Sequence, residues 1–283
     1  MVKNMNYSNC NLCPRMCGVD RGAGQRGFCG GRDTALVAKT MLHKWEEPVL
    51  AGSGGSGAVF FGGCTLGCRY CQNAAISRRP VGQPVDSARL RQIFEELIAA
   101  GAENIDLVTP TQYLPTILPA LEPKLPVPVV YNCGGYERVE ILKLLEGKVD
   151  IYLPDMKYAN NAMAKALSGA GDYFQVAAKA IREMVRQTGS PVWEGDKLRK
   201  GTIIRHLILP GCVENSLKVL DWIGETFAPG EVLVSLMRQY TPMNDVQIPG
   251  LDRRLTTREY VRVRDHMLDL GLDGYLQQKE SAT

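Results

Sequence analysis

Three closely spaced cysteines carry the strongest chemical signal in this sequence. Cys64, Cys68 and Cys71 follow the pattern C-x3-C-x2-C, directly after an apolar run (58–61) that breaks into glycines. Such a break is typical of a loop that leaves the end of a buried strand. A structural zinc site takes four protein ligands, whereas a [4Fe-4S] cluster held by three thiolates keeps one iron open for a small molecule. The odd number of thiols predicts a reactive iron-sulfur cluster, with a surface zinc or disulfide loop as the alternative.

A second group of cysteines lies near the N-terminus, at Cys10, Cys13, Cys17 and Cys29. Their pattern is C-x2-C-x3-C-x11-C, and six glycines lie within residues 18–31. A segment this rich in glycine cannot build a hydrophobic core unaided, so a bound metal is the economical explanation. Four thiolates would suit zinc, a single iron or a second [4Fe-4S] cluster. The short x3 gap slightly favours iron-sulfur, and four free thiols are the alternative.

Length and composition narrow the class of protein. The chain has 283 residues and a formal net charge of +3, enough for one large α/β domain and a small appendage. The charges form no polybasic tract, so neither nucleic acid nor a membrane is indicated as a partner. No apolar run approaches the roughly 20 residues that cross a bilayer, and residues 1–11 lack the apolar stretch of a secretory signal. We therefore expect a cytoplasmic protein with reduced cysteines.

Strand-like and helix-like segments alternate along the chain after the three-cysteine motif. Expected strands cover residues 58–61, 104–108, 127–132, 151–154, 202–209 and 231–236. Expected helices cover residues 87–101, 111–121, 138–145, 172–188, 215–227 and 256–271, and the last opens with a capping box at Thr256. A glycine-rich turn (52–57) and a polar loop (190–201) complete the pattern. Six strand-helix units predict a parallel sheet whose ligands gather at the carboxyl ends of the strands.

The three-cysteine motif resembles that of a known superfamily. An aromatic residue, Tyr70, precedes the third cysteine. The spacing together with this aromatic residue resembles the signature of radical SAM proteins. The sequence Cys-Gln-Asn, which ends at Asn73, resembles that of the branch of glycyl-radical-enzyme activases. The match is close to proteins similar to pyruvate formate-lyase-activating enzyme. The resemblance covers residues 46–280. It implies an open, partial (β/α)6 barrel over residues 46–283, preceded by a cysteine-rich metal-binding segment over residues 1–45.

The resemblance also implies cofactors and partners. In the family, the open iron of the cluster chelates S-adenosylmethionine, and one electron cleaves the sulfonium to give a 5'-deoxyadenosyl radical. Cys64, Cys68 and Cys71 would be the catalytic metal ligands, with Tyr70 and Asn73 beside the cofactor. An electron donor such as flavodoxin or ferredoxin would be a partner, and a substrate protein would be another.

Polar residues at the strand ends are the remaining site candidates. The strand at 104–108 is followed by Thr109, where activases usually carry Gly-Gly-Glu, so Thr109 would offer an oxygen to the cofactor instead, with a plain turn and helix cap as the alternative. Asn132 lies in a segment that resembles the cofactor-side Thr-Asn-Gly of activases, and a turn-forming role is its alternative. Asp155 and Lys157 resemble the activase Asp-x-Lys segment, with the carboxylate near the cofactor and the lysine on the substrate side. An exposed ion pair is the alternative for these two residues.

A charged residue interrupts one of the apolar strands. Arg205 cannot be neutralised by deprotonation, so it requires an anionic partner inside the sheet. In the resembled family the matching arginine contacts the cofactor's carboxylate or ribose. Alternation points the neighbouring His206 the opposite way, between strand and helix, and the isolated Cys133 is expected to be a small buried hydrophobe.

Three hypotheses for function follow from these residues. The first is a radical SAM enzyme that makes a glycyl radical on a partner protein. The second is radical chemistry on a small molecule or on another peptide side chain. The third is an electron-transfer or metal-binding module without chemistry of its own, although such a carrier does not require Asp155, Lys157 and Arg205 at the strand ends.

Overall fold

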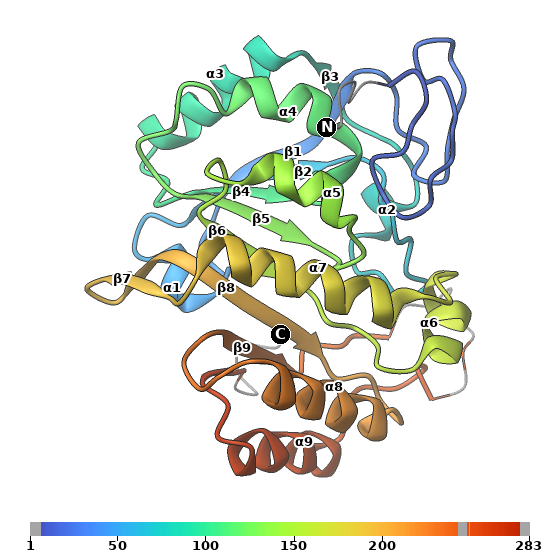
Figure 1. The fold of residues 1–283 in the computed structure, drawn as a ribbon, viewed down its shortest axis with the longest axis vertical. Coiled ribbons are helices and arrows are strands. Elements are labelled where there is room, and N and C mark those ends of the chain that lie inside the picture. Colours follow the sequence, from blue (N-terminus) through green and yellow to red (C-terminus); the bar gives the residue numbers. More distant parts are fainter. Residues whose placement is uncertain (1–6, 243–247, 249, 278–283) are drawn as a thin grey trace.

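The computed structural model describes residues 7–242, 248 and 250–277 and is built on one open, strongly twisted sheet (Figure 1). The strand order is β10-β9-β8-β6-β5-β4-β2-β1-β3. The parallel part consists of β2 (Ser56–Phe61), β4 (Ile105–Val108), β5 (Val129–Cys133), β6 (Ile151–Pro154), β8 (Lys197–Leu207), β9 (Leu233–Met237) and β10 (Gly274–Leu276). The predicted α/β class and partial, open barrel are confirmed, and every predicted strand is present.

Two further strands extend the sheet on the other side of β2. β1 (Ala35–His43) pairs antiparallel with β2, and β3 (Gln83–Val85) pairs antiparallel with β1. β1 precedes the predicted domain boundary at residues 45/46, so the sheet begins before that boundary. Residues 1–6 and 278–283 of the two predicted domains lie outside the described residues.

Amphipathic helices cover one face of the sheet (Figure 1). They are α3 (Ser87–Ala99), α4 (Leu114–Ala120) after the 3-10 turn η1 (Thr111–Tyr113), α5 (Val139–Leu142) continuing as η2 (Lys143–Leu145), α7 (Tyr173–Thr188), α8 (Val213–Thr226) and α9 (Thr257–Asp269). The capping box of α9 is confirmed, because Thr256 and Glu259 exchange their hydrogen bonds. Within the described ranges, the structure contains no helix that is both long and apolar enough to cross a bilayer.

The inner face of the sheet carries a smaller apolar cluster. Successive residues of a strand point to opposite faces, so Tyr131 of β5 joins the large cluster beneath the helices while its neighbour Val130 joins the inner one. The short helix α1 (Pro48–Ala51) contributes Val49 and Leu50 to this inner cluster. α1 therefore closes the amino-terminal end of the barrel and leaves the carboxyl ends of the strands for polar groups.

Several elements differ from the expectation. Part of the predicted polar loop 190–201 forms a strand, β7 (Val192–Glu194), which pairs antiparallel with β8. The short helices α2 (Ala74–Ser77) and α6 (Asn161–Ser168) were not predicted. α6 carries local signals that were overlooked, since Asn160 caps its N-terminus and Gly169 ends it in a left-handed conformation.

His206 packs between β8 and α8, as its alternation predicts. The ring Nδ1 lies 2.6 Å from the carbonyl oxygen of Met156, and Nε2 lies 2.8 Å from Oγ of Ser216. A neutral ring satisfies both contacts, with Nδ1–H donating to the carbonyl and the serine hydroxyl donating to Nε2. Burial lowers the pKa of His206 from its usual 6.5 to about 4.

This neutral histidine makes stability pH-dependent. Below pH 6.5 the unfolded chain binds a proton at His206, whereas the folded protein does so only near pH 4, so the free energy of unfolding falls as the pH falls through this window. Between pH 7 and about 5.5 we expect His206 to account for a loss of about 1 kcal/mol. Anaerobic urea unfolding of the parent protein and of His206→Gln at both pH values measures this term. An equal loss in both proteins would show that His206 is not its source.

Candidate iron-sulfur site at the barrel mouth

The cluster loop, residues 62–73, leaves the carboxyl end of β2 under tight steric limits. A Cβ atom at Gly62 would lie 2.1 Å from the carbonyl oxygen of Val81, and one at Gly63 would lie 2.4 Å from the carbonyl oxygen of Cys29. Gly63 also has a φ of 81°, a left-handed conformation that glycine adopts without strain. The two glycines therefore allow the loop to pass between the segment around residue 81 and the N-terminal cysteine block.

Each thiol of the cluster loop accepts a hydrogen bond from a neighbouring group. The backbone N–H of Leu66 donates to Sγ of Cys64 at 3.4 Å. The Ser168 hydroxyl donates to Sγ of Cys68 at 3.1 Å, and the Ser77 hydroxyl donates to Sγ of Cys71 at 3.3 Å. Outer hydrogen bonds of this kind orient metal-bound thiolates and tune their charge.

The donor chemistry of the loop fits an iron-sulfur cluster. Burial raises the pKa of Cys64 to about 12 and also raises the pKa of Cys68, so bare thiols would be neutral at pH 7. A coordinated metal removes these protons and turns the sulfurs into thiolate ligands. In the described part of the chain, no three Cys, His, Asp or Glu side chains are arranged closely enough to hold a metal ion. The fit to a cluster therefore rests on the chemistry of three soft sulfur donors and on the hydrogen bonds that they accept.

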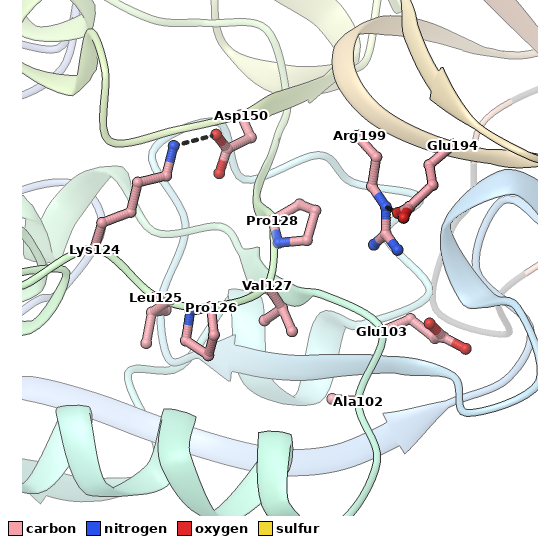
Figure 2. A pocket seen from close by; sticks show the side chains of 10 residues that line it. All are labelled: Ala102, Glu103, Lys124, Leu125, Pro126, Val127, Pro128, Asp150, Glu194 and Arg199. Carbon is pink, nitrogen blue, oxygen red and sulfur yellow. Dashed lines mark hydrogen bonds and ion pairs between the residues drawn. The ribbon is translucent and has the colours of Figure 1, made fainter.

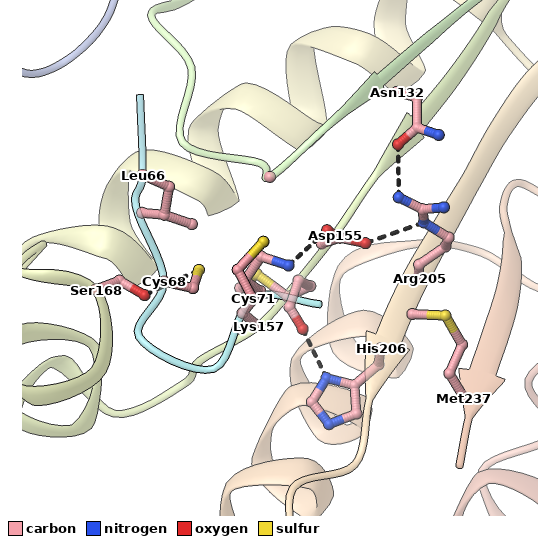
Figure 3. Close-up of polar contacts among 12 residues, drawn as sticks. Leu66, Cys68, Cys71, Asn132, Asp155, Lys157, Ser168, Arg205, His206 and Met237 are labelled. Atoms are coloured by element: carbon pink, nitrogen blue, oxygen red, sulfur yellow. Dashed lines mark hydrogen bonds and ion pairs between the residues drawn. The ribbon is translucent and has the colours of Figure 1, made fainter. Parts of the chain in front are cut away.

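An ionic network lies at the strand ends next to this loop (Figure 3). Nε of Arg205 donates to Asp155 Oδ1 at 3.0 Å, and Nζ of Lys157 donates to Asp155 Oδ2 at 2.6 Å. Nη2 of Arg205 donates to Oδ1 of Asn132 at 2.5 Å. The structure thus brings together four predicted residues that come from β5, β8 and the segment after β6.

Both cations keep Asp155 ionised. Burial alone would raise the pKa of Asp155, but Arg205 first and Lys157 second hold it below its usual value. Asp155 in turn raises the pKa of Lys157 against the effect of burial. The side chains of Asp155 and Lys157 are 14% and 17% exposed, so this is a nearly buried, fully charged pair and not the exposed pair considered from the sequence.

Acidic groups that the sequence analysis missed lie beneath Arg205. Oε1 of Glu46 lies 3.4 Å from Nη1 of Arg205, and Asn132 Nδ2 donates to Oδ2 of Asp106 at 3.3 Å. Burial, with a further contribution from Glu46, raises the pKa of Asp106 well above its usual value. Glu47 is also buried and has a raised pKa. A carboxylate in the apolar sequence of β4 was the signal that could have identified Asp106.

The other predicted cofactor residues have distinct environments. The Tyr70 hydroxyl is buried and lies 2.8 Å from that of Tyr158, which lies 2.7 Å from the Ser168 hydroxyl. Tyr70 is itself a residue of the cluster loop, and this buried contact anchors the loop to the interior of the protein. Asn73 is exposed at the start of α2. Thr109 has a φ of 57°, which is rare for a β-branched residue, and its N–H donates to the carbonyl of Asn132 at 2.8 Å.

Known proteins share both the loop and the fold. Residues 50–109 match the family model of a 4Fe-4S single cluster domain. Uncharacterized protein MJ0674 of Methanocaldococcus jannaschii is 30% identical over 273 residues, which cover 92% of this chain and 74% of that protein. A radical SAM methyltransferase from Sphaerobacter thermophilus has a similar structure, with a TM-score of 0.54, 12% identity, and coverage of 78% of this chain and 66% of that chain. This chain belongs to the family of the Methanocaldococcus jannaschii protein, and it shares the fold of the radical SAM methyltransferase.

A second solved structure shows the same fold. SuiB of Streptococcus suis, whose structure was determined bound to S-adenosylmethionine, has a TM-score of 0.55 and 12% identity, over 77% of this chain and 49% of SuiB. The chain thus spans about half to two thirds of the length of these two solved structures. At this identity the likeness concerns the fold, and the segment that matches the 4Fe-4S domain contains the cluster loop.

Two of the N-terminal cysteines contact a buried arginine. Cys10, Cys13 and Cys29 are buried and Cys17 is partly exposed. Arg21, only 3% exposed, donates from Nη2 to Sγ of Cys10 at 3.0 Å, and Sγ of Cys29 lies 3.6 Å away. Cys133, by contrast, is buried and 3% exposed, as predicted for a small hydrophobe.

A surface pocket lies at the other end of the sheet (Figure 2). A pocket of about 500 Å³ is lined by residues that precede β4, β5 and β6, together with the β7–β8 hairpin. Lys124 pairs with Asp150 at 2.8 Å and Arg199 with Glu194 at 2.5 Å along its wall. The pocket contains none of the cysteines and is remote from the strand ends that carry Asp155, so we assign it no chemistry.

The mouth network allows a prediction on stability. Arg205→Gln would leave Glu46 without its cation and Asp155 with Lys157 alone, so we expect the free energy of unfolding to fall by about 3–5 kcal/mol. The matched control is Arg89→Gln, since Arg89 forms an exposed pair with Glu96, whose loss should change stability by no more than about 1 kcal/mol. Urea unfolding under anaerobic conditions compares the two variants. Equal effects would mean that Arg205 is not the buried centre of this network.

Proposed function

We propose that this protein is a radical SAM enzyme in which Cys64, Cys68 and Cys71 hold a [4Fe-4S] cluster that binds S-adenosylmethionine. When bound, and with one electron from a donor such as flavodoxin or ferredoxin, the cluster would supply reductive cleavage of S-adenosylmethionine to methionine and a 5'-deoxyadenosyl radical, which would abstract a hydrogen atom from the substrate. Lys157 carries the proposal, because its charge acts on Cys68 on one side and on Asp155 on the other. It therefore joins the cluster loop to the ionic network at the mouth.

The mouth residues suit the methionine end of the cofactor. S-adenosylmethionine carries an ammonium group next to a carboxylate, and the mouth offers one carboxylate, Asp155, between two cations, Lys157 and Arg205. Asp155 would accept hydrogen bonds from the ammonium, while Arg205 or Lys157 would donate to the carboxylate. Asn132 holds the Arg205 guanidinium at 2.5 Å and would keep its donors oriented. Tyr70 would hold the cluster loop, and Asn73 and Thr109 would border the cofactor.

We propose a glycine of a partner protein as the substrate. The Cys-Gln-Asn sequence that ends at Asn73 and the Asp-x-Lys sequence at 155–157 support this activase-like version. A second version is modification of another peptide side chain, supported by the structure of SuiB bound to its precursor peptide SuiA, which shares this fold with a TM-score of 0.53. Radical transfer to a backbone glycine would consume one S-adenosylmethionine for each partner radical formed.

We further propose that Cys10, Cys13, Cys17 and Cys29 bind a second metal, as an iron-sulfur cluster, a single iron or zinc. Burial raises the pKa of Cys13 to about 12 and also raises that of Cys29, so these thiols need a metal to become thiolates. The buried Arg21 guanidinium cannot lose its charge and donates to the sulfur of Cys10. Metal-bound thiolates would give this cation its anionic partner.

Anaerobic reconstitution with iron and sulfide tests the proposed function. After reduction with dithionite and addition of S-adenosylmethionine, we expect 5'-deoxyadenosine, with about four irons per chain, or about eight if the N-terminal cysteines hold a second cluster. Cys68→Ala should abolish 5'-deoxyadenosine formation and remove about four irons. The matched control is Cys212→Ala, a partly exposed cysteine outside both groups, which should retain cleavage. Normal cleavage and iron content in Cys68→Ala would refute the ligand assignment.

A further inference from the structure

Arg15, between Cys13 and Cys17, reaches out of the N-terminal cysteine block to the cluster loop. Its guanidinium donates to four backbone carbonyls. Two belong to the cluster loop, Thr65 at 3.0 Å and Leu66 at 3.1 Å. The other two end α6, Ser168 at 2.8 Å and Gly169 at 2.6 Å. Carbonyls at a helix end lack partners within the helix, so Arg15 satisfies groups that would otherwise depend on water.

The geometry of this contact favours arginine. A planar guanidinium presents its five N–H donors in a fixed fork, so one side chain can bridge carbonyls of two separate segments. The Arg15 guanidinium also lies over the ring of Phe28, 3.8 Å from its centroid. α6 matters to the site because the Ser168 hydroxyl donates to Sγ of Cys68. Arg15 thus links the segment that carries Cys68 to the helix end that hydrogen-bonds its sulfur.

The cysteine block is seated directly on the cluster loop around this arginine. A Cβ atom at Gly63 would lie 2.4 Å from the carbonyl oxygen of Cys29, and one at Gly67 would lie 3.1 Å from the ring of Phe28. A second arginine makes a parallel link at the start of the loop. Nη1 of Arg21 donates to the carbonyl of Gln112 at 2.6 Å, and Nε2 of Gln112 lies 3.1 Å from the carbonyl oxygen of Gly63.

The position of Arg15 in the block depends on the cysteines around it. Met16 has a φ of 41°, a left-handed conformation that is strained for this residue, and its N–H closes a turn on the carbonyl of Cys13 at 3.0 Å. Such a conformation persists only where the surroundings enforce it. A metal bound by Cys13 and Cys17 would fix both ends of the segment that carries Arg15.

We infer that Arg15 is a positioning residue through which metal binding by the N-terminal cysteines keeps the cluster loop closed against α6. The inference rests on the proposed function, since it requires both metal sites. Its consequence is coupling between the two metal sites. A chain without the N-terminal metal holds its catalytic cluster less tightly, although all three ligands of that cluster are present. The N-terminal block is then a stabilising cover of the cluster loop.

The test is a double-mutant cycle on the full-length, anaerobically reconstituted protein. Arg15→Met removes the donors and keeps the apolar stem, and the combined change Cys13→Ala and Cys17→Ala removes the N-terminal metal. The measured quantity is the rate at which a ferrous chelator removes the cluster whose EPR signal S-adenosylmethionine perturbs. We expect each change to raise this rate about tenfold or more, because several hydrogen bonds to the loop are lost. Combining them should add little further.

Two controls separate this role from general loss of structure. Arg26→Met, which alters an exposed arginine of the same block, should stay within about twofold of the parent rate. If Arg15→Met does not fold, Arg15→Lys is the second variant, because it keeps the charge but has fewer hydrogen-bond donors. The hydrogen-exchange rate of a backbone amide in the cluster loop is then the measurement. The Arg69 amide, which donates to the carbonyl of Leu167 at 2.8 Å, should exchange faster in Arg15→Lys and after removal of the N-terminal metal.

Three results would overturn the inference. The first is that Arg15→Met loses its cluster at the same rate as the parent protein. The others are that the rate increases of the separate changes multiply fully when the changes are combined, and that the protein with Cys13→Ala and Cys17→Ala has an unchanged metal content. Failure of the proposed function looks different. In that case S-adenosylmethionine leaves the EPR signal of the parent protein unchanged, and the same cycle is followed by the visible absorbance of the cluster.

Discussion

The buried guanidinium of Arg205 is the constraint on which the inside of this barrel depends. Its charge is permanent, so β8 can carry it within the sheet only if acceptors and anions approach from other elements. Asp155 approaches from the end of β6, Asn132 from β5 and Glu46 from the start of α1. Segments far apart in the sequence therefore meet at one charge, and their relative placement sets the shape of the mouth.

The polar groups around Arg205 differ in charge because their surroundings differ. Asp106 is fully buried near another carboxyl group, and its raised pKa favours the protonated form. Asp155 lies between two cations, which hold its pKa low. The apolar cluster contributed by α1 keeps water from the lower part of the barrel, while the upper part presents fixed charges next to the cluster loop. Pre-oriented charges of this kind bind an ionic ligand with little reorganisation.

The N-terminal cysteine block packs directly on the cluster loop and is not merely an appendage to the barrel. Arg15 donates to the carbonyls of Thr65 and Leu66 in the cluster loop, Arg21 reaches the start of the loop through Gln112, and the loop glycines leave room for the backbone of the block. β1, which follows the block directly, is hydrogen-bonded into the sheet beside β2. The two groups of cysteines are separated in sequence, but the segments that carry them pack against each other. A few hydrogen bonds connect the two segments, so a structural change in one can affect the other.

Local features of the sequence predicted the strands, most helices and the loop with three cysteines. The spacing of Cys64, Cys68 and Cys71, the period of apolar residues and the capping box at Thr256 all involve near neighbours in the chain, so they could be recognised before the fold was known. The need of Arg205 for an anion was also apparent, because it follows from the chemistry of one side chain. Alternation along the strand likewise oriented His206 correctly.

Only the tertiary structure decided which groups meet. Glu46 stands in a polar segment without a local signal of its role, and only folding places it against Arg205, 159 residues away in the sequence. β7 and β10 were missed because short strands form where a partner edge is available, which no local pattern records. Arg15 looked like one of many charged residues, and its role appeared only when folding brought the carbonyls of Leu66 and Gly169 to its guanidinium. Burial and long-range pairing are properties of the folded chain, so the charge states of the site could not be derived from residue types alone.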